Sequence, residues 1–185
     1  NGVTSIDYGA FEGCTSLTSI TIPEGVTSID SSAFFGCTSF TSITIPNSVT
    51  SIESDAFDGC SKLSSVYIPD NVSFLSSSAF PNSTELVFSP GNNNFKSENG
   101  VTYNISTGEI AHVHIPSDGK VKIPDGVTVI GDSAFEGCTS LTSITIPDSV
   151  TSIGMGAFYN CTSLTSITIP DSVTSIEMGA FYNCS

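Results

Sequence analysis

An alanine–phenylalanine pair recurs at a constant interval along this chain, and this period constrains the fold more than any other feature. The pairs fall into two groups, at 10–11, 33–34, 56–57 and 79–80, and then at 134–135, 157–158 and 180–181. The interval from Phe80 to Phe135, between the two groups, is not a multiple of the period. The sequence therefore predicts a single repeat domain over residues 1–185, with a regular array over 1–83, an irregular unit over 84–123 and a second regular array over 124–185. Because both ends fall inside a repeat, we expect the chain to be part of a longer protein.

Each copy predicts one coil built from short extended segments. Ser19–Ile22 alternates polar and β-branched apolar residues, which favours a short strand, and Pro23 ends it because proline lacks an N–H. Val26–Ile29 predicts a second, shorter strand, and Ser32–Cys37 predicts a 3₁₀ or single helical turn that reverses the chain. One coil buries little apolar surface, whereas stacked copies place isoleucine on isoleucine and phenylalanine on phenylalanine. The predicted fold class is a β-rich repeat solenoid.

The repeated pattern Leu-x-x-Ile-x-Ile-Pro-x-x-Val-x-x-Ile-x-x-x-Ala-Phe-x-x-Cys resembles the BspA-like class of leucine-rich repeats, found in surface and secreted proteins of bacteria and some protozoa. Residues 99–104, ahead of residues 123–127, also resemble the hairpin insert of that family. The resemblance implies a right-handed leucine-rich-repeat arc with parallel strands on the concave face and one irregular hairpin insert in the middle. It further implies a location outside the cell or on its surface, and adhesion to host or matrix proteins.

Two polar columns are expected on the exposed face of the longer strands, because residues that flank an inward isoleucine point outward. One column contains Ser19, Ser42, Ser65, Ser143 and Ser166, and the other contains Thr21, Thr44, Tyr67, Thr145 and Thr168. These side chains either solvate an exposed sheet or form a docking face for a protein or a glycan. Tyr67 is the most informative member, because exposed tyrosines are enriched at binding hot spots. A regular hydroxyl array also suits ice binding, although a curved sheet fits a flat lattice poorly.

The irregular unit holds both histidines and two of the four lysines between positions 112 and 122. Two of its tetrapeptides copy the Ile-Thr-Ile-Pro signature, which predicts His114 and Lys122 in the exposed threonine column and His112 and Lys120 two positions before them. These four residues either form a cationic island for an acidic partner or merely replace threonine as exposed polar residues. Two histidines at i and i+2 also suit a shared metal ion, but the spacing fixes no third ligand.

All six cysteines occupy the same position of the repeat. Side chains stacked on adjacent coils have Cβ atoms about 4.8 Å apart, farther than the roughly 3.5–4.5 Å of a disulfide. The close cysteine pairs typical of zinc sites are absent from the sequence. We therefore expect free, buried thiols and no metal or other cofactor.

The chain has a formal net charge of -14 from 18 acidic residues and four lysines. This charge argues against a nucleic-acid partner, because phosphate binding needs a basic surface. The sequence contains neither an apolar run long enough to cross a membrane nor a recognisable signal peptide at its start, so no membrane insertion is predicted. It also lacks nucleophile motifs and glycine-rich phosphate loops, which argues against an enzyme.

Taken together, these features predict a non-enzymatic adhesion or protein-interaction module that binds an extracellular protein or glycan through the exposed face of its repeat sheet. A passive stalk that displays another domain is the alternative.

Overall fold

The computed structural model describes residues 2–184 and divides them into two compact units, the first ending at Phe95 and the second beginning at Lys96. Every regular element in residues 2–184 is a β-strand. No helix in this range has the length and apolar character needed to cross a membrane. The fold is thus a β-solenoid, as the repeat period predicts.

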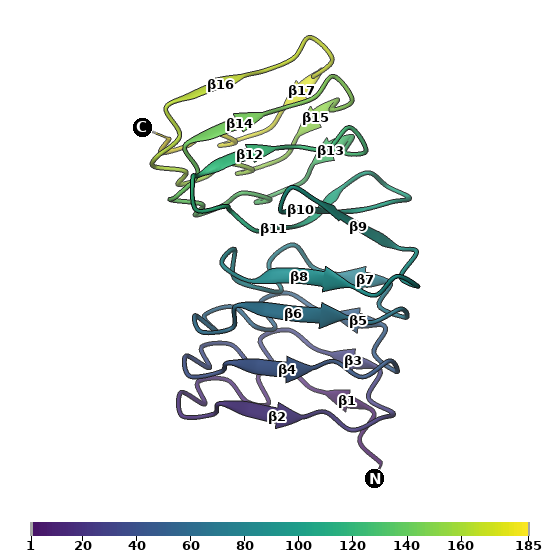
Figure 1. The fold of residues 1–185 in the computed structure, drawn as a ribbon. Coiled ribbons are helices and arrows are strands. Elements are labelled where there is room, and N and C mark those ends of the chain that lie inside the picture. The colour runs from purple at the N-terminus through teal and green to yellow at the C-terminus, as the bar shows by residue number, and fades with distance from the viewer. Residues whose placement is uncertain (1, 185) are drawn as a thin grey trace. The chain divides into compact units, whose positions relative to one another are not determined.

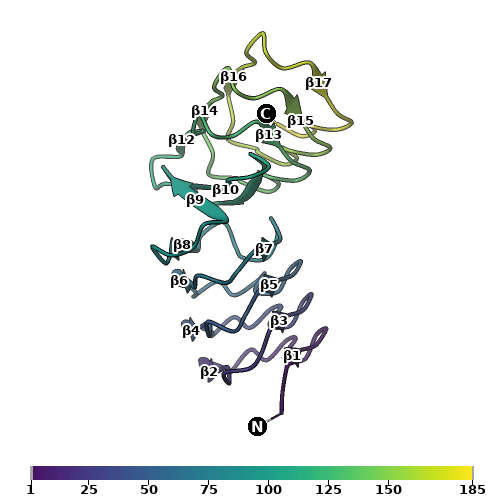
Figure 2. The ribbon, with the colours of Figure 1, turned by 90° about the vertical axis from the view of Figure 1, so that its right-hand side faces the viewer.

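The first unit is a stack of coils with two series of parallel strands (Figure 1). The longer series comprises β2 (Ser19–Thr21), β4 (Ser42–Thr44), β6 (Ser65–Ile68) and β8 (Glu85–Phe88). The shorter series comprises β1 (Ser5–Ile6), β3 (Ser28–Ile29), β5 (Ser51–Ile52) and β7 (Phe74–Leu75). Figure 2 shows the longer strands along one side of these coils and the shorter strands along the other. Paired residues are one period apart, as in Ser19 opposite Ser42, so each side chain lies next to its own copy.

Successive β-turns reverse the chain after each short strand. In the second coil, the backbone N–H of Phe35 donates to the carbonyl oxygen of Ser32 at 3.0 Å, and the N–H of Cys37 donates to Phe34 at 3.2 Å. Ser32 and Gly36 have positive φ angles of 57° and 69°. A left-handed residue interrupts a right-handed helical path, so the expected 3₁₀ or helical turn takes the form of separate β-turns.

Phenylalanine rings form the centre of the spine. In the first unit, the rings of Phe11, Phe34, Phe57 and Phe80 stack in order, with centroid separations of 5.1, 5.1 and 4.8 Å. Phe40 replaces the usual leucine and stacks on Phe34 at 5.5 Å. Columns of buried isoleucine, valine and alanine surround the rings. Neighbouring coils therefore bury each other's apolar side chains, and this burial supplies the main stabilisation.

The irregular segment contains one further parallel strand and a three-stranded antiparallel insert. β8 pairs in register with β6 although it follows that strand by less than one period, so that Tyr67 lies opposite Val87. β9 (Phe95–Glu98), β10 (Val101–Asn104) and β11 (Ile110–Val113) form a separate sheet in the order β11-β10-β9. Asn99 and Gly100, with φ angles of 54° and 79°, form the two-residue connection between β9 and β10, typical of a tight hairpin. β10 and β11 are antiparallel, which confirms the expected hairpin.

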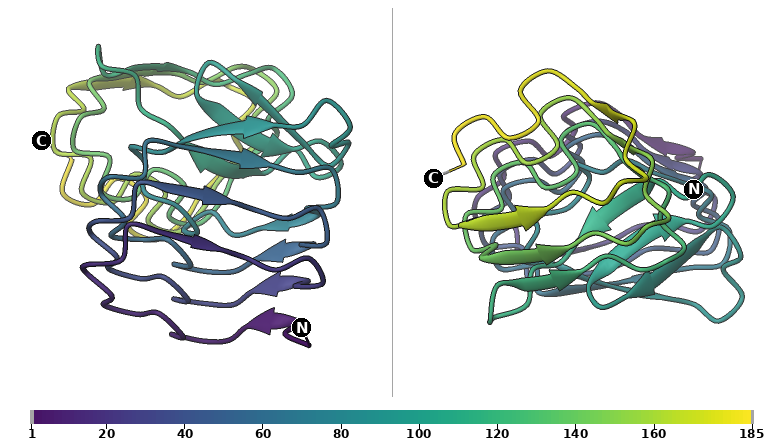
Figure 3. Two further views of the ribbon diagram at one scale, coloured as in Figure 1. Left: turned by 60° about the horizontal axis from the view of Figure 1, so that its bottom comes forward. Right: turned by 90° about the horizontal axis from the view of Figure 1, so that it is seen from above.

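The second unit resumes the parallel solenoid, as the two views of Figure 3 show. Its longer strands are β12 (Lys120–Lys122), β14 (Ser143–Thr145) and β16 (Ser166–Thr168), and its shorter strands are β13 (Val129–Ile130), β15 (Ser152–Ile153) and β17 (Ser175–Ile176). Phe135, Phe158 and Phe181 stack with centroid separations of 4.9 and 5.1 Å. Tyr103 and Val113 of the insert belong to the same buried cluster, so the hairpin packs onto this core.

Candidate interaction surface

The outer faces of the longer strands carry the predicted hydroxyl columns. In β2 and β4, each inward isoleucine is flanked by an exposed serine and an exposed threonine, and β16 repeats this arrangement. The register places Thr21 beside Thr44 in the first unit and Thr145 beside Thr168 in the second. The exposed threonine column is therefore present in each unit.

These hydroxyls differ from the hydroxyls elsewhere in each coil. Another threonine column binds the preceding coil: Thr50 Oγ1 donates to the carbonyl oxygen of Thr27, one 23-residue period earlier, at 3.1 Å, and Thr174 Oγ1 donates to Thr151 at 3.2 Å. Thr41 Oγ1 likewise donates to the carbonyl of Thr18 at 3.2 Å. Within residues 2–184, the side chains of the outward threonines on β2, β4, β14 and β16 make no such bond. Their donors and acceptors are available to a partner.

Tyr67 interrupts the threonine column of the first unit with an aromatic ring. It is 52% exposed, and its neighbour in register, Val87, is 46% exposed. Exposed Glu85 lies opposite Ser65 on the same two strands. Tyr67 and Val87 on β6 and β8 thus form a small exposed apolar patch, bordered by polar side chains, on an otherwise polar sheet.

Lys120 and Lys122 lie where the sequence pattern predicts. Both are exposed on β12, with Lys120 in register with Ser143 and Lys122 with Thr145. They therefore continue the serine and threonine columns of the second unit.

The predicted exposure of the two histidines is wrong. His112 lies in the antiparallel strand β11 opposite Thr102 and is 2% exposed. His114 follows β11, is half-buried, and its backbone N–H donates to the carbonyl of Gly100 at 2.7 Å. The Ile-Thr-Ile-Pro-like segment around His114 belongs to the hairpin insert, because β11 pairs with β10 and not with a solenoid strand. The cationic island is thereby reduced to its two lysines.

The six cysteines are free thiols, as expected, but the expected burial fails for Cys14, which is exposed, and Cys184 is only half-buried. Cys37, Cys60, Cys161 and Cys184 each donate a weak thiol hydrogen bond to a phenylalanine carbonyl of the preceding coil. Cys60 Sγ donates to the carbonyl oxygen of Phe34 at 3.3 Å, and Cys161 Sγ donates to that of Phe135 at 3.1 Å. Burial raises the pKa of the Cys60 and Cys161 thiols to about 12, so both stay protonated at neutral pH. A protonated, buried thiol is a poor nucleophile and a poor metal ligand. No group of three or more histidine, cysteine or acidic side chains in residues 2–184 is arranged to hold a metal ion.

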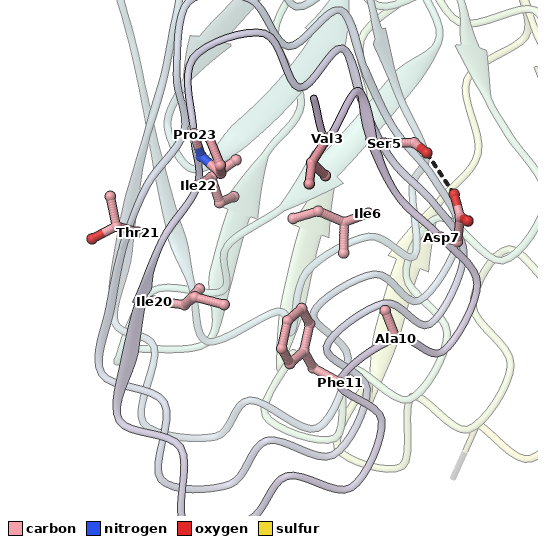
Figure 4. A pocket seen from close by; sticks show the side chains of 10 residues that line it. All are labelled: Val3, Ser5, Ile6, Asp7, Ala10, Phe11, Ile20, Thr21, Ile22 and Pro23. Atoms are coloured by element: carbon pink, nitrogen blue, oxygen red, sulfur yellow. Dashed lines mark hydrogen bonds between the residues drawn. The ribbon is translucent and has the colours of Figure 1, made fainter. Parts of the chain in front are cut away.

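A hollow of about 380 Å³ lies against the first coil. Phe11, Ile20 and Ile22 line it, and Figure 4 shows Thr21 pointing away from it. Asp7 is the one carboxylate in the lining, and it accepts a hydrogen bond from Ser5. Among the lining side chains, Phe11, Ile20 and Ile22 occupy spine positions that neighbouring coils cover elsewhere in the stack. The hollow therefore has the character of an uncovered end of the spine.

Comparison with protein families shows that residues 1–106 and 117–185 match a model described as the BspA type leucine rich repeat region, in six copies. Comparison with curated proteins gives no significant match.

Three solved structures are similar to the chain. A leucine-rich cell surface protein from Faecalibacterium prausnitzii is 30% identical, with a TM-score of 0.71, over 95% of this chain and 54% of its own. A leucine-rich repeat protein from Bacteroides ovatus is 30% identical, with a TM-score of 0.52, over 97% of this chain and 38% of its own. The pneumococcal vaccine antigen PcpA is 20% identical, with a TM-score of 0.60, over 92% of this chain and 57% of its own, and shows the shared fold. The chain spans about half the length, or less, of the first two proteins.

Proposed function

Because the chain belongs to the family of BspA-type leucine-rich repeat proteins, we propose that it is a protein-interaction or adhesion module at the cell surface or in the extracellular space. It acts by binding, and it contacts an extracellular protein through the outward faces of its longer strands. The surface location is supported by a similar protein from Faecalibacterium prausnitzii, which is described as a cell surface protein.

The observation that carries the proposal is the difference between the hydroxyl columns. Thr27 and Thr50 belong to a column that holds coils together, whereas the outer-face side chains of Thr21 and Thr44 make no hydrogen bond within residues 2–184. An exposed sheet with free donors and acceptors offers many weak polar contacts over a large area, which suits a docking face.

Tyr67 is proposed as the anchor of the first unit. Tyrosine combines a large apolar ring with a polar tip, and such residues dominate the binding energy of many interfaces. Val87 beside it extends the apolar contact, and exposed Glu85 lies two residues before Val87 on β8. A partner that covers this apolar patch removes the side chains of Tyr67 and Val87 from water.

A solid-phase assay with the immobilised chain and a panel of purified matrix and serum proteins tests the proposal. Saturable binding is expected, and Tyr67→Thr, which restores the usual repeat residue, should weaken it at least about tenfold. The matched control is Tyr8→Ser, because Tyr8 is 74% exposed on a turn and serine occupies that position in the next two coils.

Each result has a defined meaning. Equal binding by the Tyr67→Thr and Tyr8→Ser variants would remove Tyr67 as the anchor. Absence of saturable binding to any protein of the panel would favour the passive stalk. Binding to a glycan array with no protein binding would replace the protein partner by a glycan.

A further inference from the structure

The outward face of the β12-β14-β16 sheet combines two ammonium groups with four hydroxyls. Its two columns, read across the strands, are Lys120, Ser143 and Ser166, and Lys122, Thr145 and Thr168. None of these six positions carries a carboxylate. In the first unit, by contrast, the equivalent positions hold one acidic residue, Glu85, and no lysine.

The two lysines are not neutralised within the chain. In residues 2–184, the one ion pair that involves a lysine joins Lys96 Nζ to Glu98 Oε1 at 2.7 Å. Asp118, two residues before Lys120, accepts a hydrogen bond from the backbone N–H of Lys120 at 3.1 Å and thereby caps the start of β12. Lys120 and Lys122 thus present uncompensated positive charge on a protein with a formal net charge of -14.

We propose that this lysine-bearing face binds an acidic peptide segment of a partner protein, in which two carboxylates alternate with neutral residues. The inference rests on the proposed function and specifies the chemistry of the partner. Lys120 and Lys122 are two residues apart on one strand, so their Cα atoms lie about 6.6 Å apart on the same face. Alternate side chains of an extended peptide have the same spacing, so two ion pairs form together.

The hydroxyl columns complete the match. Ser143 and Thr145 lie about 4.8 Å from the lysines across the strands, within reach of the neutral polar groups of such a peptide. Hydroxyls both donate and accept, so they accommodate the backbone and short polar side chains of the segment.

A long polyanion fits this face poorly. Only two positive charges are available, and the negative field of the whole chain repels a ligand with many charges. A segment with two carboxylates gains both local ion pairs and experiences less of this repulsion. The charge distribution therefore favours an acidic peptide over a sulfated glycan.

Fluorescence anisotropy with a labelled Gly-Ser-Asp-Ser-Asp-Ser-Gly peptide and its Asn-for-Asp counterpart tests the inference. The 185-residue chain should bind the Asp peptide about 2- to 30-fold more tightly than the Asn peptide, because the Asn peptide lacks both ion pairs, and this difference should shrink at higher salt. The double substitution Lys120→Gln and Lys122→Gln should weaken binding about 2- to 30-fold, the range expected for two exposed ion pairs. Lys62→Gln is the control, because Lys62 is an exposed lysine of the first unit.

Equal loss of affinity in the Lys62→Gln variant, or equal binding of the two peptides, would overturn the inference. Aggregation of the double variant with unchanged peptide binding would also overturn it, and would assign the lysines to protecting the edge strand β12. Stronger binding of heparin than of the Asp peptide would replace the peptide by a polyanion. If the Asp peptide fails while the chain still binds a matrix protein, the inference is wrong and the proposed function stands.

Discussion

Replacing Phe57 by alanine tests whether the phenylalanine stack holds the coils together. Phe57 is fully buried, and its ring stacks on Phe34 at 5.1 Å and on Phe80 at 4.8 Å. It also contacts the tilted ring of Phe40 at 6.4 Å. The substitution therefore removes two stacked pairs and leaves a cavity in the middle of the spine.

The expected cost is large compared with the stability of the first unit. Truncation of a buried phenylalanine to alanine costs about 3–5 kcal/mol. A unit of 95 residues has a free energy of unfolding of about 5–14 kcal/mol. The Phe57→Ala variant should therefore lose about a fifth or more of the stability of that unit.

Two further substitutions give the matched comparison. Phe11 has one stacked neighbour, Phe34, and is only half-buried, so Phe11→Ala should cost less than Phe57→Ala. Phe35 is 39% exposed on the adjoining turn, so Phe35→Ala should cost about 1 kcal/mol or less. The cost should thus rise in the order Phe35, Phe11, Phe57, as expected when stability comes from contacts between neighbouring coils.

Urea unfolding followed by far-ultraviolet circular dichroism measures these differences, since the chain has no tryptophan to report by fluorescence. If Phe57→Ala lies within about 1 kcal/mol of Phe35→Ala, the ring stack does not hold the coils together. Stability would then have to come from the isoleucine and valine columns alone.

Three other predictions concern the buried thiols and the buried Asn92 amide. Burial raises the pKa of the Cys60, Cys138 and Cys161 thiols to about 12, so iodoacetamide should alkylate exposed Cys14 first in the folded chain, and equal rates would contradict this. The folded chain keeps thiol protons that the unfolded chain releases above about pH 9. Urea titrations should therefore show the free energy of unfolding falling as the pH rises from about 9 to 12, with no thiol-linked change below about pH 9. The buried Asn92 amide bonds the carbonyls of Pro69 and Val72 and the N–H groups of Asn94 and Phe95, so Asn92→Ala should cost about 3 kcal/mol in urea unfolding. Exposed Asn93→Ala should cost less than about 0.5 kcal/mol, and similar costs for the two variants would contradict the role of Asn92.

The regular coils were predictable because every level of the sequence agrees there. The constant period, the Ser-Ile-Thr strands and the prolines all indicate one coil, and stacking follows from the need to bury the same apolar side. The exposure of Thr21, Thr44, Lys120 and Lys122 follows from strand alternation alone.

The irregular segment was harder to predict, because residues there that resemble a solenoid strand pair with a different strand. The segment around His114 resembles the Ile-Thr-Ile-Pro signature of a solenoid strand. The residues before His114 instead form β11, which pairs with β10 in the hairpin. The Asn99-Gly100 dipeptide marks the turn between β9 and β10, but no comparable turn signal shows that the residues before His114 pair with β10. The strand β8 was missed because it follows β6 by less than one period, and no local pattern identifies Asn92 as a buried residue.

The shortened step from β6 to β8 distinguishes one alignment of the coils from the others while the chain folds. Among regular coils, a slip by one whole coil during folding still places isoleucine on isoleucine and phenylalanine on phenylalanine, because the same register recurs in every coil. At β8 this equivalence ends: Tyr67 meets Val87, and the Asn92 amide meets the carbonyls of Pro69 and Val72. The departure from the repeat selects one alignment among several near-equivalent ones. Duplication or deletion of a regular coil would consequently preserve these contacts, whereas the irregular coil fixes which coils are neighbours.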